Sequence, residues 1–550
     1  MQPAKQPTNQ SATTALPANP LGEARAFYRK GNFDAAIAKY QEILKDRPNS
    51  PDALAGMVRV YLKQKNVDLA ARTAEQGLKL TDAPRIHVAQ GEVLFRQGRI
   101  HAAETEWINV INSGYPEARA FLGLARVRNA LAMYKGAKDM LDHAHQLDPN
   151  DPDINDAWIG VLSRAERIAY LEKSLAGDNN WNADERGDVS NYLQYLRERA
   201  KQKNQSPCRL ISKITATETP LVRLLEDPRH MRGYGLNVVL NGHKSALMLD
   251  TGASGILVRH TIAERAGITK ISATKVWGIG KKGRRDAYVG VADSIKIGEL
   301  EFQNCPIEVV ESGSVVGDEG LIGVDVLENF LVDIDFPNEK LKLSPLPARP
   351  GESQTNVTLK SEDNSDDDVD DSNENKSDVG KSSNTKSDTK SANAKSGAAT
   401  PIGLRDAYIA PEMKNYSRVF RFGHDLLIPT SIGQVPQKLF LIDTGSLVNF
   451  ISPEAAREVT KVHGDSDIVV EGISGHVDKI YSANKAILIF GHLKQENQDM
   501  TAFDTKPLSD SIGTEVSGFL GFTTLRMLDI KIDYRDALVD LTYNAKLFGK

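Results

Sequence analysis

The chain has 550 residues, of which 40% are hydrophobic and 26% charged, and its formal net charge is −5 at pH 7. This length exceeds what one hydrophobic core supports, so we expect several domains of ordinary soluble composition. The mildly acidic balance excludes the basic surface that would attract nucleic acid or an anionic membrane, and the longest apolar runs are too short to span a bilayer.

Residues 1–21 are polar and rich in Pro, Ser, Thr and Asn, which predicts a disordered leader. The leader has no apolar run flanked by basic residues and therefore no secretory signal. A mature start left after signal removal is the alternative, and composition does not separate the two. The compartment is accordingly unknown: a removed leader would favour a periplasmic or other extracytoplasmic location, and otherwise the cytoplasm is expected.

Residues 22–200 are rich in Ala, Leu, Gln, Arg and Lys and carry few strand signals, so this region is expected to be all-α. Four of its segments superpose with spacings of 35, 32 and 34 residues. Each unit is marked by a small residue where two helices of a hairpin would approach closely: Ala36, Ala71, Ala103 and Ala137.

A large apolar side chain follows three of these alanines by four residues, namely Tyr40, Trp107 and Leu141. The pattern resembles the tetratricopeptide repeat, and a degraded further unit surrounds Ala169. The resemblance implies a solenoid with a concave groove that binds peptides or partner proteins, and it names no partner. An ordinary helical bundle is the alternative, which the regular spacing disfavours.

Residues 351–402 contain no aromatic residue and almost no large aliphatic residue, which predicts a disordered linker. Its acidic front, "SEDNSDDDVDDSNE", lacks the glycine and distal glutamate of an EF-hand. A solvated charge run is therefore favoured over a calcium site. The linker separates two segments of similar length, 207–350 and 403–550.

These two segments are built alike. "ALMLDTGASGILV" contains Asp250, and "LFLIDTGSLVNF" contains Asp443, 193 residues further on. Each Asp-Thr-Gly ends a probable hairpin, which in the first segment is expected to turn at Asn241–Gly242. Each also precedes a short strand that runs into a helix, and in the second segment Ser452 is expected to cap that helix, with Pro453 at its first position. Near the end of each segment, "GLIGVDVLENFLVDIDF" also matches "GFLGFTTLRMLDIKIDY", two apolar residues and a glycine before a short helix and an alternating strand.

Each segment thus resembles one lobe of an aspartic protease of the retropepsin/pepsin class. The resemblance covers about half of the chain. It implies a multidomain fold, in which an N-terminal all-α TPR-like solenoid precedes two mainly-β retropepsin-like (acid protease) barrel lobes. The implied activity is that of an aspartic endopeptidase acting on a peptide or protein substrate.

The resemblance makes Asp250 and Asp443 the catalytic dyad. Two carboxylates ~3 Å apart repel by ~5 kcal/mol even at an effective dielectric of 20, so they share one proton. The ionised member takes a proton from a bound water, which attacks the peptide carbonyl, and the protonated member donates to the carbonyl oxygen. This chemistry needs no metal and no cofactor, and none is expected.

The residues that follow each aspartate are expected to support it. Threonines would hydrogen-bond across to the opposite lobe, and glycines would let backbone N–H groups approach the carboxylates. A serine hydroxyl is available to Asp443, whereas Ala253 offers none to Asp250, so Asp443 is expected to be the more readily ionised member. The supporting set is Thr251, Gly252, Thr444, Gly445 and Ser446.

Two glycine-rich stretches are expected to form flaps over a bound peptide. In the first half the flap residues are Trp277, Gly278, Ile279 and Gly280. The Gly-x-Gly-x-x-Gly spacing there also occurs in nucleotide-binding loops, but no convincing parallel strand precedes it and no apolar-periodic helix follows. In the second half the corresponding flap residues are Gly472, Ile473 and Gly475.

Two alternatives to this interpretation remain. The chain could be a non-catalytic interaction scaffold, or a protease whose dyad forms only between two chains, so monomer and homodimer stay open. Retention of both aspartates with both threonines and both glycines favours the enzyme. The two cysteines, Cys208 and Cys305, fit no zinc site, and buried free thiols are favoured over one structural disulfide.

Overall fold

The computed structural model describes residues 19–177, 183–201, 208–225, 227–276, 278, 285–311, 319–350, 406–465, 470–472, 475–477 and 479–543. The expected disordered linker and all but the end of the expected leader lie outside these residues. The chain divides into two compact units, Met1–Gly123 and Leu124–Lys550. Among the described residues, no helix combines the length and apolar character needed to cross a membrane.

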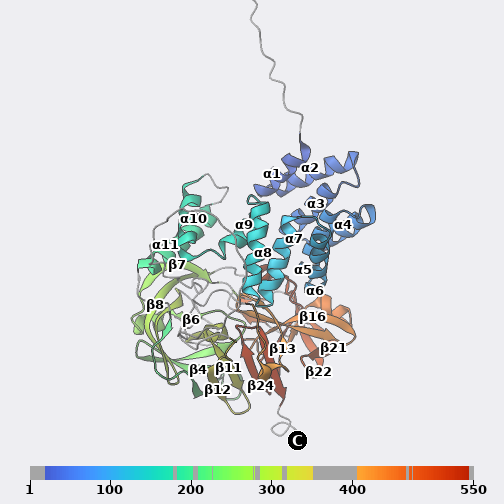
Figure 1. The fold of residues 1–550 in the computed structure, drawn as a ribbon. Coiled ribbons are helices and arrows are strands. Elements are labelled where there is room, and N and C mark those ends of the chain that lie inside the picture. Colours follow the sequence, from blue (N-terminus) through green and yellow to red (C-terminus); the bar gives the residue numbers. More distant parts are fainter. Residues whose placement is uncertain are drawn as a thin grey trace, which may run out of the picture. The chain divides into compact units, whose positions relative to one another are not determined.

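The first unit is a run of antiparallel helix pairs (Figure 1). Asparagine side chains cap two helices by accepting hydrogen bonds from backbone N–H groups, at Asn32 and Asn66. Proline opens three others, at Pro20, Pro51 and Pro84. The helices are α1 (Pro20–Arg29), α2 (Phe33–Asp46), α3 (Pro51–Lys63), α4 (Val67–Leu80), α5 (Pro84–Arg96), α6 (Ile100–Asn112) and α7 (Ala118–Ala130), which continues into the second unit.

The aromatic residues predicted from the repeat pack against glycines of neighbouring helices. A Cβ added at Gly56 would lie 2.3 Å from the Tyr40 ring, and one added at Gly123 would lie 2.3 Å from the Trp107 ring. Trp107 is fully buried, and a Cβ added at Gly91 would lie 2.5 Å from the same ring. Because such distances are far inside van der Waals contact, the repeat needs both the aromatic and its facing glycine.

The position predicted for one repeat alanine was wrong by a single residue. Ala36, Ala103 and Ala137 are buried as expected, but in α4 the buried alanine is Ala70, while Ala71 is only partly buried. The corrected spacings are 34, 33 and 34 residues. The error arose because Ala70 and Ala71 are adjacent, so sequence comparison alone could not tell which one faces the interior.

The second unit begins with further helices. Ser163 and Glu166 cap α10 reciprocally, which fixes its start. These helices belong to the same compact unit as the β-rich remainder of the chain, so the division between units falls inside the region expected to be one repeat domain. The helices are α8 (Tyr134–Leu147), α9 (Pro152–Ile159), α10 (Arg164–Ala176) and α11 (Ala183–Lys201).

The first lobe surrounds a nine-stranded sheet in the order β1-β9-β6-β10-β5-β4-β8-β7, with β3 paired to β4. Its hairpin turn is left-handed at Asn241 and Gly242, with φ of 47° and 86°, as predicted from the Asn-Gly pair. The strands are β1 (Arg209–Leu210), β3 (Val222–Leu225), β4 (Met231–Leu240), β5 (His243–Asp250), β6 (Ile256–Arg259), β7 (Lys270–Val276), β8 (Arg285–Ile297), β9 (Leu300–Val310) and β10 (Gly320–Gly323), with α12 (His260–Arg265) after β6 and η1 (Val324–Leu327) after β10.

The second lobe repeats this topology in an eight-stranded sheet, ordered β14-β15-β16-β23-β17-β22-β21-β18. Ser452 caps the helix after β17, with Pro453 at its first position, as expected. The elements are β14 (Phe420–Phe422), β15 (Asp425–Ile432), β16 (Val435–Ile442), β17 (Phe450–Ile451), α13 (Pro453–Arg457), β18 (Val462–Asp465), β21 (Ile480–Phe490), β22 (Leu493–Phe503), α14 (Lys506–Ile512), β23 (Gly518–Leu520) and α15 (Phe522–Leu525), with η2 (Pro411–Met413) before β14.

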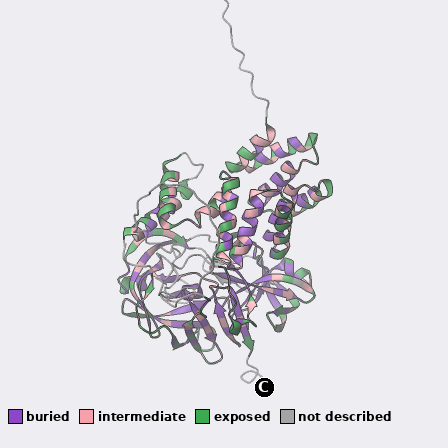
Figure 2. Ribbon diagram, in the orientation of Figure 1, coloured by how far each residue is buried: buried purple, intermediate pink, exposed green. Residues whose placement is uncertain are grey.

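A six-stranded sheet joins the two lobes, because β11 of the first pairs with β24 of the second. Val332 lies opposite Ile532, and Ile334 opposite Ile530, and all four side chains are fully buried. Figure 2 shows burial concentrated along the strands of the lobes. The sheet comprises β13 (Ser417–Arg418), β25 (Leu538–Tyr543), β24 (Leu528–Asp533), β11 (Phe330–Asp335), β12 (Lys340–Pro345) and β2 (Thr217–Pro220).

The preference for free thiols was wrong, because Cys208 and Cys305 form a disulfide. The edge strand β1 pairs with β9, with Arg209 opposite Gln303, which brings the two cysteines together. Their separation of 97 residues gives no local signal of this pairing in the sequence. Both are buried, so the disulfide ties the start of the first lobe to its central hairpin.

Candidate active site

The two Asp-Thr-Gly segments meet at the junction of the lobes. Asp250 is the last residue of β5 and lies opposite Gly323 of the parallel strand β10. Asp443 follows β16, which pairs in parallel with β23 in the same way. The residues just before each aspartate, 247–249 and 439–442, are apolar and buried, and both aspartates are themselves buried, 9% and 6% exposed. The sheet thus forces two carboxyl groups into one low-dielectric site.

The threonines bind across the junction, as expected. The backbone N–H of Thr251 donates to Oγ1 of Thr444, and the N–H of Thr444 donates to Oγ1 of Thr251, both at 3.0 Å. Each hydroxyl in turn donates to a carbonyl of the opposite lobe, Thr251 to Ile442 at 2.7 Å and Thr444 to Leu249 at 2.8 Å. This reciprocal set of four bonds fixes the two loops relative to each other.

Each glycine of the pair lies against the carboxyl group of the other lobe. A Cβ added at Gly252 would lie 2.9 Å from Oδ1 of Asp443, and one added at Gly445 would lie 2.5 Å from Oδ2 of Asp250. Any larger residue would push the opposite carboxyl away. The glycines are therefore needed for close approach of the dyad, in addition to offering their N–H groups.

The hydrogen bonds to the two carboxyl groups are unequal. Asp250 accepts from the N–H of Gly252 at 2.9 Å. Asp443 accepts from the N–H groups of Gly445 and Ser446 at 2.9 and 3.1 Å, and its Oδ2 accepts from the Ser446 hydroxyl at 2.6 Å. The hydroxyl bond expected from Ser446 is therefore present, and it falls on the aspartate for which it was expected.

The pKa values of both aspartates follow from this environment. Burial, and next the charge of Asp443, raise the pKa of Asp250 to about 8. Burial also raises the pKa of Asp443, but the hydrogen bonds from the Ser446 hydroxyl and from backbone N–H groups oppose that rise. The hydrogen bonding therefore favours the ionised form of Asp443 over that of Asp250.

Two further buried carboxyl groups adjoin the dyad, and sequence reasoning missed both. Asp325, 3% exposed, accepts a hydrogen bond from the N–H of Gly255 at 3.1 Å. Asp425, 6% exposed, begins β15 after the turn at Gly423. Burial, and then the charges of Asp443, Asp250 and Asp325, raise the pKa of Asp425 well above its ordinary value.

The expected flaps are described only in part. In the first lobe the strands β7 and β8 pair from Lys270 opposite Gly290 to Val276 opposite Arg285. Gly278 is described, but Trp277, Ile279 and Gly280 lie outside the described residues. In the second lobe, β19 (Glu471–Gly472) and β20 (Gly475–His476) form a two-stranded hairpin, and Ile473 lies outside the described residues. Within the described part of the chain, no group of three or more His, Cys, Asp or Glu could hold a metal ion.

Comparison with known proteins identifies both parts of the chain. Residues 236–326 match the model of the aspartyl protease family, and residues 27–93 match that of the tetratricopeptide repeat. The chain therefore carries a retropepsin-like aspartyl protease domain and tetratricopeptide repeats. The predicted fold class, helical repeats followed by β-rich protease-like lobes, is confirmed.

Two curated proteins are similar to part of the chain. The chain is 31% identical over 110 residues to the UBA domain-containing protein Mud1 of Schizosaccharomyces pombe, covering 20% of this chain and 32% of that protein. It is 32% identical over 108 residues to the DNA damage-inducible protein 1 of Chaetomium globosum, covering 19% and 23%. The chain thus spans a third or less of the length of these relatives.

Solved structures resemble the helical part. A thermophilic TPR protein of Thermus thermophilus is 21% identical, with a TM-score of 0.26, covering 32% of this chain and 97% of that one. The pilF protein of Pseudomonas aeruginosa is 20% identical, with a TM-score of 0.24, covering 33% and 84%. Because both TM-scores are low, the identification of the repeats rests on the family model.

Proposed function

We propose that this protein is an aspartic endopeptidase whose two catalytic carboxyl groups, Asp250 and Asp443, come from the two lobes of one chain. The observation that carries this proposal is the reciprocal bonding of the two Asp-Thr-Gly loops, which brings two buried and unequally hydrogen-bonded carboxyl groups together. A scaffold that only binds partners would need neither the paired carboxyls nor their unequal hydrogen bonding.

In the proposed mechanism a water molecule lies between the two aspartates. Asp443, ionised and held by Ser446, accepts a proton from the water as the oxygen attacks the peptide carbonyl. Asp250 donates its proton to the carbonyl oxygen, on which negative charge develops. Collapse of the tetrahedral intermediate returns a proton to the amine leaving group, and the dyad again holds one proton.

Formation of the dyad within one chain is supported by the sheet that joins the lobes. The pairing of β11 with β24 covers four residue pairs between Val332 and Asp335 of the first lobe and Asp529 and Ile532 of the second. Its inward side chains belong to a hydrophobic cluster that includes residues of both lobes. An interchain dyad would require this buried sheet to separate and form again between two molecules.

The helical repeats would supply a binding arm for a substrate or a partner protein, since stacked helix pairs present a concave surface. The Cys208–Cys305 disulfide supports an extracytoplasmic location, because disulfides persist mainly in oxidising compartments.

Cleavage of a peptide library between pH 3 and 7 tests the proposed activity, with wild type, Asp250→Asn and Asp443→Asn compared at equal concentration. The proposal expects wild type to cleave and both variants to lose at least ~10³-fold in kcat/KM, because each loses one partner of the shared proton. Full activity in either variant would contradict it. Circular dichroism of the variants checks that they remain folded.

A further inference from the structure

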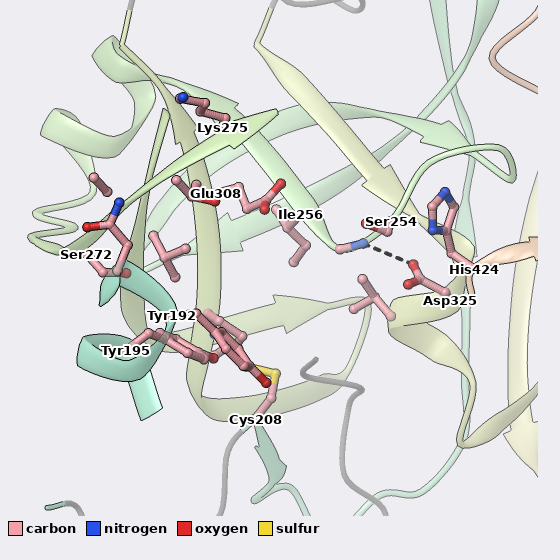
Figure 3. Close-up of a pocket in the computed structure, with 18 of the residues that line it drawn as sticks. Tyr192, Tyr195, Cys208, Ser254, Ile256, Ser272, Lys275, Glu308, Asp325 and His424 are labelled. Carbon is pink, nitrogen blue, oxygen red and sulfur yellow. Dashed lines mark hydrogen bonds between the residues drawn. A yellow bond between two sulfur atoms is a disulfide. The ribbon is translucent and has the colours of Figure 1, made fainter. Parts of the chain in front are cut away.

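A cavity of about 630 Å³ lies beside the active-site loop of the first lobe (Figure 3). Ser254 and Gly255, four and five residues after Asp250, line it together with Asp325. The N–H of Gly255 donates to Oδ1 of Asp325, so the loop that carries the catalytic aspartate also forms this wall of the cavity. A peptide bound at the dyad would therefore have this cavity beside it.

A helix from outside the two lobes lines the opposite part of the cavity. Tyr192 and Tyr195 of α11 contribute two rings stacked at 6.5 Å and 19°. Figure 3 shows them with Cys208, at the other end of the cavity from Ser254, Asp325 and His424.

The helix α11 is fixed against the first lobe. The Arg167 guanidinium donates from Nη1 to the Tyr192 hydroxyl at 3.0 Å, and Gln194 Nε2 donates to the Ile271 carbonyl of β7 at 3.4 Å. Leu193, Tyr195 and Leu196 belong to a buried apolar cluster against which Val289 of β8 packs. The tyrosines are therefore held in place by contacts on both sides of the helix.

Among the described residues that line the cavity, acidic side chains outnumber basic ones. They are Asp188, Glu308 and Asp325, against Lys275 and one histidine. In Figure 3 the Glu308 carboxylate points toward the Ser254 end, and the Lys275 ammonium points away from Asp325. The interior thus combines aromatic faces, an apolar floor and carboxylates.

We infer that α11 completes a distal specificity subsite of the cleft, which selects an arginine side chain of the substrate. A guanidinium is planar, stacks on aromatic rings and pairs with carboxylates through a fork of N–H donors, so it matches both features of the cavity. Its aliphatic stem would lie along Ile256. This inference rests on the proposed function, because the occupant is a residue of the cleaved peptide.

The test begins with a randomised peptide library, whose cleavage products locate the position, other than the two that flank the cleaved bond, at which Arg is enriched. Matched peptides with Arg or Gln at that position are then compared. The expected Arg/Gln ratio of kcat/KM is at least about tenfold, the lower range for a charge-assisted hydrogen bond. A ratio near one in a cleaving enzyme overturns the subsite and leaves the proposed activity intact.

Two substitutions test whether the preference for Arg over Gln arises in this cavity. Glu308→Gln is expected to lower the Arg/Gln ratio at least about threefold by removing a carboxylate of similar shape. Glu311→Gln, just past the end of the same strand and paired with exposed Lys270, should leave the ratio unchanged. Equal ratios in wild type and both variants would contradict the assignment.

The contribution of α11 is tested by a second pair of variants. Tyr192→Leu removes an aromatic ring and should lower the ratio, whereas Tyr192→Phe loses the hydroxyl bond to Arg167 but keeps the ring and the ratio. The role given to stacking would be overturned if Tyr192→Phe also lowered the Arg/Gln ratio, or if neither variant lowered it. Urea unfolding of each variant shows whether a lowered Arg/Gln ratio comes from loss of folded protein.

Direct binding separates failure of the subsite from failure of the proposed function. Labelled peptide pools with Arg or Gln fixed within an otherwise randomised sequence, which need no prior cleavage data, are titrated into Asp250→Asn protein and followed by fluorescence anisotropy. If wild type does not cleave but the Arg pool binds more tightly in a Glu308-dependent way, the subsite stands and the protease activity does not. Equal binding of the two pools without cleavage overturns the subsite.

Discussion

Thr251 and Thr444 each donate a backbone hydrogen bond to the other's hydroxyl oxygen, at 3.0 Å in both directions. The two residues lie in different lobes and are 193 positions apart in the chain. Their reciprocal bonding makes the position of one catalytic loop depend on that of the other. The same hydrogen bonds therefore determine both the stability of the lobe junction and the geometry of the dyad.

Replacing Thr444 by Ala is expected to weaken both folding and catalysis. The change leaves the buried N–H of Thr251 without its acceptor and the Leu249 carbonyl without its donor, which costs about 1–3 kcal/mol per unsatisfied group. Urea unfolding and peptide cleavage measure the two effects. Thr444→Ser keeps the hydroxyl and should retain most of both, and a Ser variant as impaired as the Ala variant would contradict this account.

Asp250→Asn is expected to change stability with a defined dependence on pH. The pKa of Asp250 is raised from an ordinary value of 3.8 to about 8, so between these values the unfolded chain has released a proton that the folded protein retains. Stability of the wild type therefore falls as pH rises through this window, by up to about 1.4 kcal/mol per pH unit, and the penalty is absent below it.

The asparagine variant does not carry this penalty, and its amide can still donate a hydrogen bond to Asp443. Its free energy of unfolding relative to wild type should therefore be higher at pH 8 than at pH 4, although it is inactive. Urea unfolding at the two pH values measures the difference. A relative stability that is the same at both would contradict the raised pKa.

Ser446→Ala is expected to move the acid limb of the pH–rate profile upward. Loss of the hydroxyl bond to Oδ2 of Asp443 disfavours the ionised carboxylate, so its pKa should rise. The complementary change is Ala253→Ser, which offers a hydroxyl to Asp250 and should lower the pKa that limits activity at high pH. An unchanged acid limb in the first variant would mean that Asp443 is not the ionised member.

Removal of the disulfide should lower stability without abolishing the dyad. The double substitution of Cys208 and Cys305 by Ser is expected to cost about 2–4 kcal/mol, because it frees the start of the first lobe in the unfolded chain. A reducing agent should shift the urea midpoint of wild type to that of the variant and leave the variant unaffected. A wild type insensitive to reduction would contradict the disulfide.

Much of the lobe architecture could be predicted because corresponding local sequence patterns occur in both halves of the protease region. The apolar strand before each aspartate, the Asn241–Gly242 turn, the Ser452 cap and the short helix after Gly323 or Gly521 are all local patterns. Local patterns depend on neighbouring residues alone, so one sequence suffices to find them.

The remaining features depend on contacts between distant segments. No sequence pattern singled out Asp325 and Asp425, which the fold buries beside the dyad. The Cys208–Cys305 disulfide depends on the pairing of β1 with β9. The packing of α11 on β7 likewise joins distant segments, because the hydrogen bond from Gln194 to Ile271 spans 77 positions.

The central claim is that one chain supplies both catalytic carboxyls, and mixing two inactive variants tests it most directly. Asp250→Asn and Asp443→Asn proteins are unfolded together in urea, refolded by dilution and assayed for peptide cleavage beside wild type treated in the same way. A dyad within one chain predicts recovery of wild-type activity and none in the mixture. Cleavage by the mixture would contradict the account, because it requires Asp250 of one molecule to pair with Asp443 of another.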